Sequence, residues 1–163
     1  MFAPKMFGVC LRYSKDYSEA EDCLQEGFIK VFTYLKNFRH EGSFEGWMRK
    51  IMVNVSIEKF RKQQLLFPVD DIRVFEGQQQ QQEGIIEKIS AGELVELIQS
   101  LTPRYRMVFN LFVMEGMSHK EIADTMNITE GTSKSNLARA RDILKQRVTE
   151  LYGEAQDMHN FSA

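Results

Sequence analysis

Hydrogen-bond donors gather in one helix-like stretch of the second half of the chain. They are Lys134, Ser135, Asn136, Arg139, Arg141, Lys145 and Arg147. Between residues 131 and 149 five basic residues face a single acid, Asp142, whereas the whole chain has a net charge of −2. Basic side chains bind phosphate, and arginine, serine and asparagine also hydrogen-bond to base edges. The stretch favours nucleic-acid binding, although a solvated basic face on a packing helix would share this composition.

The surrounding sequence predicts two helices joined by a tight turn over residues 118–148. Ser118 and Glu121 form an S-x-x-E capping box for the first helix. Residues 127–129 interrupt the pattern, and Thr129 suits the N-cap of the second helix. Apolar residues then recur at helical spacing: Leu137, Ala140, Leu144 and Val148. A helix-turn-helix with a basic second helix is typical of proteins that enter the DNA major groove.

A second basic region lies in the first half of the chain. Phe38, Phe44 and Trp47 are interleaved with basic residues over 37–47. Aromatic rings in such a setting can stack on unpaired bases, and they can equally anchor a loop to the core. Within the helix predicted over 44–63, residues 48–62 carry five basic residues against one acid, Glu58: Arg49, Lys50, Lys59, Arg61 and Lys62.

The helix predicted over residues 18–36 has a polar set beside its apolar stripe. Ser18 and Glu21 form a second S-x-x-E box at its start. The expected inward stripe is Leu24, Phe28, Val31 and Leu35. The polar set comprises Asp22, Gln25, Glu26 and Lys30. Periodicity alone explains this set by ordinary solvation.

Other classes of function find no support in the sequence. Cys10 and Cys23 lack metal-ligand spacing and are expected to be small buried hydrophobes in a reducing cytoplasm. The three histidines stand apart, and there is no phosphate loop or nucleophile–base set. No run of eighteen apolar residues appears, so we expect no membrane insertion. We therefore expect no catalytic residue, no metal and no cofactor.

The chain is predicted to be all-α, with two small helical domains joined by an acidic flexible linker. The predicted segments are a first domain over 1–63, a linker over 64–89, a second domain over 90–152 and a disordered tail over 153–163. The linker holds five acids against two bases and a run of five glutamines. Further helices are expected over 5–15, 93–101 and 104–114.

Three motifs, in this order and spacing, resemble the sigma-70 family of bacterial RNA polymerase sigma factors, in its extracytoplasmic-function group. They are AEDCLQEGFIKVF, FRHEGSFEGWMRKIMVN and SHKEIADTMNITEGTSKSNLARAR. The resemblance implies sigma region 2 in the first half, for core binding and for recognition and melting of the −10 element. It implies region 4 in the second half, for the −35 element. It also implies a specificity subunit and not an enzyme.

The resemblance assigns roles to individual residues. Docking on the clamp of the polymerase is implied for Asp22, Gln25 and Glu26. Contacts with the −10 element are implied for Phe38, Arg39, Ser43, Arg49, Asn54, Lys59, Arg61 and Lys62. Contacts with the −35 element are implied for Thr132, Lys134, Ser135, Asn136, Arg139 and Arg141. The chain departs from the family at Ser133, where valine is common, and at Asn136, where arginine is common.

The implied partners are core RNA polymerase and promoter DNA, and the resemblance leaves open a membrane-bound anti-sigma factor. The implied location is the cytoplasm. The alternative from the residues alone is a stand-alone helix-turn-helix regulator that binds operators through residues 118–148. That alternative leaves the polar set of residues 18–36 and the aromatic loop unexplained.

Overall fold

The computed structural model of the chain describes residues 1–66 and 89–160, with side chains described as far as Tyr152. The chain forms two compact units, which we describe separately. The described residues are helical and contain no strand, which confirms the predicted all-α class. The linker predicted over 64–89 lies outside the described residues, except for its first three positions and its last.

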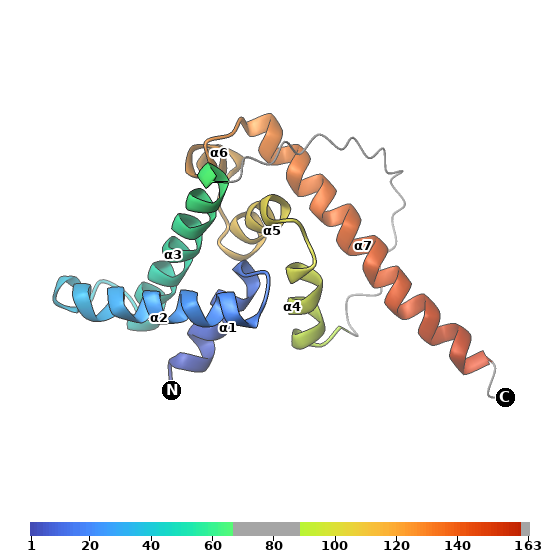
Figure 1. Cartoon of the computed structure of the whole chain (residues 1–163), viewed down its shortest axis with the longest axis horizontal. Helices are drawn as coiled ribbons and strands as arrows, with labels where there is room; N and C mark the ends of the chain where they lie inside the picture. Colours follow the sequence, from blue (N-terminus) through green and yellow to red (C-terminus); the bar gives the residue numbers. More distant parts are fainter. Residues whose placement is uncertain (67–88, 161–163) are drawn as a thin grey trace. The chain divides into compact units, whose positions relative to one another are not determined.

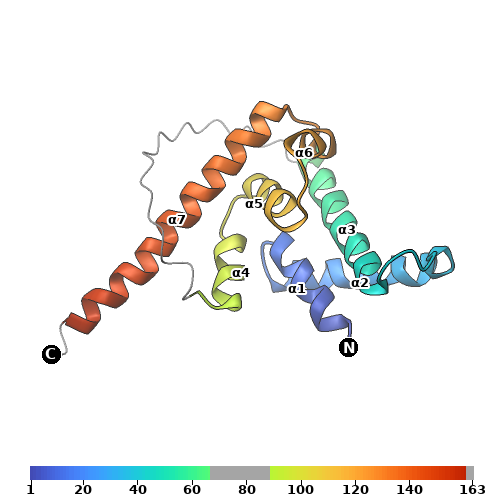
Figure 2. The ribbon, with the colours of Figure 1, turned by 180° about the vertical axis from the view of Figure 1, so that it is seen from behind.

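The first unit is built from three α-helices that each pack against the other two (Figures 1 and 2). Its elements are α1 (Ala3–Tyr13), α2 (Tyr17–Tyr34), the short 3-10 helix η1 (Leu35–Asn37) and α3 (Phe44–Leu66). Sulfur-containing and small side chains fill its centre: Met6, Cys10, Cys23, Met48, Met52 and Val55. Methionine fills irregular spaces between helices because its side chain is unbranched and flexible.

Helix α2 starts earlier than predicted and has a different cap. The Oδ1 atom of Asp16 accepts a hydrogen bond of 2.8 Å from the backbone N–H of Glu19. The carboxylate of Glu19 in turn accepts from the backbone N–H of Lys15 at 2.6 Å. The predicted Ser18 box is therefore wrong, because aspartate is as good an N-cap as serine and stands two residues earlier.

The inward face of α2 also differs from the predicted stripe. Val31 is buried as expected, but Leu35 is 45% exposed. The other buried positions are Ala20, Cys23 and Gly27. Small residues allow the backbones of packed helices to approach closely, and a Cβ atom on Gly27 would collide with the sulfur of Met52 in α3. The face of α2 that is buried is therefore the one whose small residues let the α2 backbone approach α3 closely, and not the most hydrophobic one.

The second unit consists of α4 (Ala91–Gln99), α5 (Pro103–Phe109), the π-helical segment η3 (Asn110–Met114), α6 (His119–Met126) and α7 (Glu130–Asn160). Helix α7 packs against α4, α5 and α6. Arg106 of α5 is buried and donates from Nη2 to the carbonyl oxygens of Gln99 and Leu101, at 2.8 and 2.7 Å. These bonds satisfy carbonyl groups at the end of α4 that have no partner within the helix.

The predicted helix-turn-helix is confirmed in its details. Ser118 and Glu121 form a reciprocal capping box at the start of α6. Asn127 ends α6 in the left-handed conformation, with φ of 55° and ψ of 50°. Thr129 Oγ1 accepts from the backbone N–H of Thr132 at 3.1 Å, as an N-cap does.

Two boundaries of the second unit differ from the prediction. Helix α4 begins at a capping box formed by Ser90 and Glu93, whereas the periodicity argument started this helix at residue 93. Helix α7 continues to Asn160, whereas the sequence predicted a disordered tail over 153–163. The tail contains good helix formers such as glutamate, alanine, glutamine and methionine. A single glycine at 153 does not stop such a helix.

Candidate nucleic-acid interface

The first turns of α7 present an exposed polar face. Ser135 lies at its centre, and Arg139 follows one turn later on the same side. Thr132 begins this face, and its hydroxyl lies 2.9 Å from that of Thr129. Lys134 is exposed at the flank. The structure thus brings together four of the six side chains predicted to contact the −35 element.

Asn136 does not belong to this face. Its side chain is only 7% exposed, and its amide nitrogen is buried without a hydrogen-bond partner. Position 136 lies about 100° around the helix from Ser135, toward the side that packs on the rest of the unit. The prediction that Asn136 contacts DNA therefore conflicts with its burial.

Ser133, the other departure from the family pattern, has a partner that explains it. Its side chain is fully buried, and its Oγ lies 3.0 Å from Nδ1 of His119 in α6. The His119 ring stacks on Phe112, with ring centroids 4.7 Å apart and an angle of 23° between the planes. Ser133, His119 and Phe112 thus join α6, α7 and η3 directly behind the exposed face of α7.

Arg141 lies against the same aromatic ring. Its guanidinium carbon is 5.6 Å from the centroid of the Phe112 ring, a cation–π distance. Arg141 is nevertheless exposed, so its donors remain accessible to an anion. The structure therefore places Arg141 at the edge of the polar face, held by Phe112 and apart from Ser135 and Arg139.

Aromatic side chains of the first unit form a cluster at the loop between η1 and α3. The Phe38 ring lies 4.7 to 5.4 Å from the rings of His40, Phe44 and Trp47. Phe44 and Trp47 stack with centroids 5.6 Å apart, and Phe2 meets Phe44 edge-on at 5.8 Å. Phe38, Phe44 and Trp47 are half-buried, so the cluster both anchors the loop and exposes ring surface.

Ser43 and Arg39 have different surroundings within this loop. The hydroxyl of Ser43 accepts a 3.0 Å hydrogen bond from the backbone N–H of Gly46, so Ser43 caps α3. Arg39 is exposed beside the aromatic cluster. A cap leaves the second lone pair and the proton of the hydroxyl available, so Ser43 combines this structural role with access to a ligand.

Asn54 and the basic residues of α3 fall into two sets by their position around the helix. Asn54, Lys50 and Arg61 are exposed and share one face, because their spacings of four and seven residues complete one and two helical turns. Lys62 is exposed at the flank of this face. Arg49 and Lys59 each stand five residues from Asn54, on the other side of α3, and both are half-buried. Lys50 was absent from the predicted site, although counting helical turns from Asn54 would have found it.

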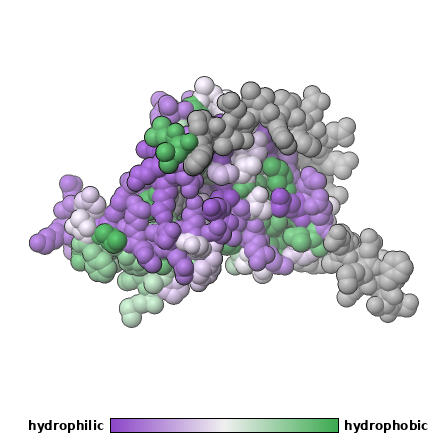
Figure 3. All heavy atoms as spheres, viewed as in Figure 1, coloured by the Kyte–Doolittle hydropathy of each residue, from purple (hydrophilic) through white to green (hydrophobic). Residues whose placement is uncertain are grey.

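The polar set of α2 forms a ridge that continues into apolar side chains. Asp22 and Gln25 are exposed, and Glu26 is half-buried beside them. One and two turns farther along the same face, Ile29 and Phe32 are 65% and 72% exposed. Figure 3 shows a largely hydrophilic surface interrupted by small apolar areas of this kind. The sequence analysis gave Ile29 and Phe32 no role, because it considered only the polar side chains outside the predicted apolar stripe.

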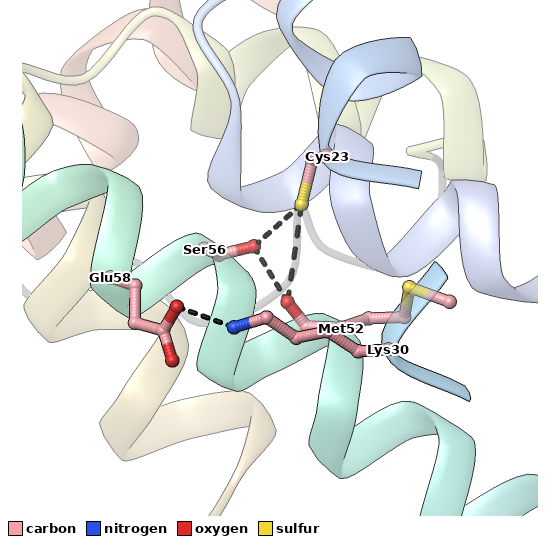
Figure 4. A network of polar contacts seen from close by, with 5 residues as sticks. All are labelled: Cys23, Lys30, Met52, Ser56 and Glu58. Carbon is pink, nitrogen blue, oxygen red and sulfur yellow. Dashed lines mark hydrogen bonds and ion pairs between the residues drawn. The ribbon is translucent and has the colours of Figure 1, made fainter. Parts of the chain in front are cut away.

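An ion pair between helices lies near this ridge. Nζ of Lys30 in α2 is 2.5 Å from Oε2 of Glu58 in α3 (Figure 4). The hydrogen bond from Lys30 to Glu58 raises the pKa of Lys30, and burial opposes it. The pair ties α2 to α3.

Two absences from the described part of the chain bear on the class of site. Within the described residues, no group of three or more histidine, cysteine, aspartate or glutamate side chains could hold a metal ion. In the same part of the chain, no helix is both long enough and apolar enough to cross a membrane. The arrangement therefore offers exposed donors, aromatic surface and one mixed polar and apolar ridge.

Comparison with known sequences relates both units to described families. Residues 1–65 match the family described as Sigma-70 region 2, and residues 91–144 match the family described as Sigma-70, region 4. The chain is 30% identical over 144 residues to the ECF RNA polymerase sigma-E factor of Escherichia coli, an alignment that covers 82% of this chain and 75% of that protein.

Two other relatives are similarly distant. The ECF RNA polymerase sigma factor SigW of Bacillus subtilis is 28% identical over 162 residues, covering 93% of this chain and 87% of that protein. SigE of Mycolicibacterium smegmatis is 29% identical over 147 residues, which are 88% of this chain but only 57% of that protein. A solved Bartonella quintana sigma factor, RpoE, in complex with the anti-sigma factor NepR, has a similar fold. The TM-score is 0.53 at 21% identity, over 91% of this chain and 92% of that one.

Proposed function

The chain belongs to the extracytoplasmic-function group of the sigma-70 family, the non-catalytic subunits that give bacterial RNA polymerase its promoter recognition, and on that premise we propose which residues perform each step. The order of the two matched regions along the chain is the observation that carries the assignment. A stand-alone regulator would have no use for the first region.

We propose that the ridge of α2 docks on the core polymerase. The support is its composition: exposed Asp22 and Gln25, half-buried Glu26, and then the exposed Ile29 and Phe32 on the same face. Interfaces combine an apolar centre with a polar rim, and exposed phenylalanine is unusual on a surface that binds nothing. The ridge is acidic, so it suits a basic partner and not DNA.

For the −10 element we propose a pocket between the aromatic cluster and α3. Phe38 and Trp47 offer ring surface for an unpaired base, worth ~1–3 kcal/mol per stacked base. Arg39 and Ser43 supply donors from the loop. Asn54 offers both a donor and an acceptor to a base edge from α3, with Lys50, Arg61 and Lys62 on the path of the DNA backbone. Arg49 and Lys59 are given no contact in this proposal, because they lie on the other side of α3.

For the −35 element we propose that the first turns of α7 enter the major groove. Ser135 and Arg139 would face base edges, and Thr132, Lys134 and Arg141 would bind phosphates on either side. The support is that Ser135, Lys134 and Arg141 are exposed and Thr132 and Arg139 half-buried, while Ser133 and Asn136 pack inward. An arginine that binds guanine in a bidentate manner contributes ~1–3 kcal/mol of discrimination.

DNA binding by this protein should depend on the polymerase, because the net charge of the chain is negative. The chain has a net charge of −2, so the free protein repels DNA outside its basic faces. We propose that core binding provides the additional affinity, and that both the polymerase and the promoter are met in the cytoplasm. An anti-sigma factor, membrane-bound or not, would inhibit the protein by covering the α2 ridge.

In vitro transcription tests this function. Purified core polymerase is mixed with the full chain and with a library of genomic promoter fragments. We expect transcripts from a small set of fragments that share −35 and −10 sequences, and none from core alone. Sequence-specific binding by a dimer of the chain, without any effect on transcription by core polymerase, would support the stand-alone regulator instead.

A further inference from the structure

Two cysteine thiols meet in the core of the first unit. Cys10 of α1 and Cys23 of α2 are free thiols, 0% and 1% exposed. Their side chains are hydrogen-bonded to each other across the contact between α1 and α2. Promoter recognition requires nothing of either thiol, and an apolar side chain would fill the same space.

The sulfur of Cys23 has polar neighbours on a third helix. Its Sγ lies 3.2 Å from Oγ of Ser56 and 3.9 Å from the carbonyl oxygen of Met52, both in α3 (Figure 4). Ser56 also donates to the Met52 carbonyl at 3.0 Å, so Ser56 keeps a partner when the sulfur moves. Cys23 is therefore the point at which α1, α2 and α3 are joined by polar contacts.

The surroundings make the two thiols unequal. Hydrogen bonds from Cys10 and then from Ser56, together with the positive charge of Lys59, lower the pKa of Cys23, although burial opposes them. The same thiol–thiol hydrogen bond, followed by burial, raises the pKa of Cys10. Cys23 therefore ionises readily, and Cys10 keeps its proton. In a reactive dithiol the ionised thiol attacks an external disulfide, and the other thiol then resolves the mixed disulfide.

We propose that Cys10 and Cys23 form an oxidisable dithiol, and that a small-molecule disulfide converts it to an internal disulfide that weakens polymerase docking. The thiolate of Cys23 attacks one sulfur of the small disulfide and releases the other half as a thiolate. Cys10 then attacks the Cys23 sulfur of the mixed disulfide, and its proton goes to the departing second thiolate. Two protein thiols lose two hydrogens, and the small disulfide is reduced to two thiols.

The effect on docking, which rests on the function proposed above, follows from geometry. A disulfide brings two sulfur atoms to about 2.0 Å, well inside the separation of a hydrogen-bonded pair. Forming it draws α2 toward α1 and breaks the contact of Cys23 with Ser56. Cys23 is the residue next to Asp22 and precedes Gln25 by two, so the ridge moves with it. Because the small residues of α2 fix its approach to α3, a shift of α2 also disturbs the contact between Gly27 and Met52.

Burial sets the conditions of the reaction. A small disulfide reaches Cys23 only when α1 opens locally from α2 and α3. Binding of the ridge to polymerase opposes that opening, so the free protein should oxidise faster than the polymerase-bound protein. The device would thus act on sigma factor that is not yet engaged in transcription.

Mass spectrometry of the intact full chain tests the reaction. The reduced protein is incubated with oxidised glutathione under native conditions, alongside the single variants Cys10→Ser and Cys23→Ser. We expect the unmodified sequence to lose two hydrogen atoms and to recover them with dithiothreitol. We expect Cys10→Ser to accumulate a glutathione adduct at Cys23, and Cys23→Ser to react more slowly. Cys10→Ala serves in place of Cys10→Ser if the serine variant does not fold.

Affinity for core polymerase, measured on the same samples, tests the consequence. Oxidised protein should bind at least about fivefold more weakly than reduced protein, the lower end of a typical coupling between sites. Adducts without an internal disulfide, or oxidation only under denaturing conditions, would refute the dithiol. An internal disulfide that left affinity unchanged would refute the control of docking. If reduced protein failed to bind core at all, the proposed function would be wrong, whereas the mass result would still decide the dithiol.

Discussion

Gly27 of α2 lies against the side chain of Met52 in α3 so closely that a methyl group on residue 27 would overlap the Met52 sulfur. Met52 is fully buried, so it has little room to withdraw. Helices α2 and α3 therefore approach each other through a position without a side chain. Gln25 and the rest of the ridge lie on the other side of α2, and their placement depends on this approach.

Gly27→Ala should destabilise the first unit. Overpacking a core costs ~1–3 kcal/mol, which exceeds the gain of up to ~1 kcal/mol from replacing glycine in a helix. Gly8→Ala is the matched control, because a Cβ atom on Gly8 of α1 would meet nothing within 4 Å. That control should be neutral or stabilising. Urea unfolding followed by the fluorescence of Trp47, the chain's single tryptophan, reports on this unit. Equal effects of the two substitutions would refute the close contact.

Asn54→Ala should impair promoter opening without affecting stability, because Asn54 is an exposed residue of α3. A fluorescent base analogue in the −10 element should brighten less when the variant holoenzyme opens the promoter. Phe38→Ala should reduce the same signal and also lower stability, because Phe38 packs on three other rings. Each aromatic pair contributes ~0.5–1.5 kcal/mol. Lys59→Ala, on the other side of α3, is the control, and an equal loss of signal in it would contradict the assigned pocket.

Substitutions in α7 should separate recognition from packing. Arg139→Ala should relax preference at one or two positions of the −35 element, by ~1–3 kcal/mol. Lys134→Ala should weaken all sequences alike, as loss of a phosphate contact does. Asn136→Leu should leave sequence preference unchanged and not reduce stability, because the buried amide nitrogen of Asn136 has no partner to lose. Promoter selection from a randomised −35 library measures all three, and altered selection by Asn136→Leu would return that residue to the interface.

At acidic pH the starts of α4 and α6 in the second unit should become less stable, because each begins with a capping box that contains a glutamate. Hydrogen bonds with Ser90 and Ser118 lower the pKa values of Glu93 and Glu121 below the ordinary range of a glutamate. A depressed pKa in the folded state stabilises the fold above the unfolded pKa, and this stabilisation disappears as pH falls through the folded pKa. Amide hydrogen exchange at the starts of α4 and α6 should therefore accelerate as the pH falls below the ordinary glutamate pKa of about 4.3. The double variant Glu93→Gln and Glu121→Gln keeps the acceptors without the charge, and it should flatten this dependence.

Much of the fold followed from local patterns in the sequence. The capping box at Ser118, the turn at Asn127 and the N-cap at Thr129 are local hydrogen-bonding devices, and the structure contains all three. The buried face of α1 follows helical spacing in the same way, because Met6, Val9, Cys10 and Tyr13 lie on one face of the helix.

The errors arose where the partner of a residue is distant in the sequence. Gly27 faces inward because of Met52. The predicted apolar stripe of α2 therefore held at Val31 but not at Leu35, which is exposed. Ser133 is buried because of His119, and Asn136 turns inward beside it. The motif that assigned Asn136 to DNA contains no information about these contacts. Ile29 and Phe32 were given no role, because only polar side chains were considered outside the predicted stripe.

The docking ridge connects the fold to the function, and its contribution can be isolated. Replacing Asp22, Gln25 and Glu26 together with alanine should leave the fold intact, because none is fully buried. Phe32→Ala should also preserve the fold, since its side chain is 72% exposed. Asp124→Ala, at an exposed position of α6 in the other unit, is the control for a lost acidic charge.

Equilibrium titration of labelled full-length protein with core polymerase is the most direct test. The unmodified protein and Asp124→Ala should bind with the same affinity, and the triple variant should lose at least about tenfold, or ~1.4 kcal/mol. Phe32→Ala should fall between them, and all four proteins should show the same thermal unfolding. Undiminished affinity of a folded triple variant would contradict the assignment of the α2 ridge as the polymerase-binding surface.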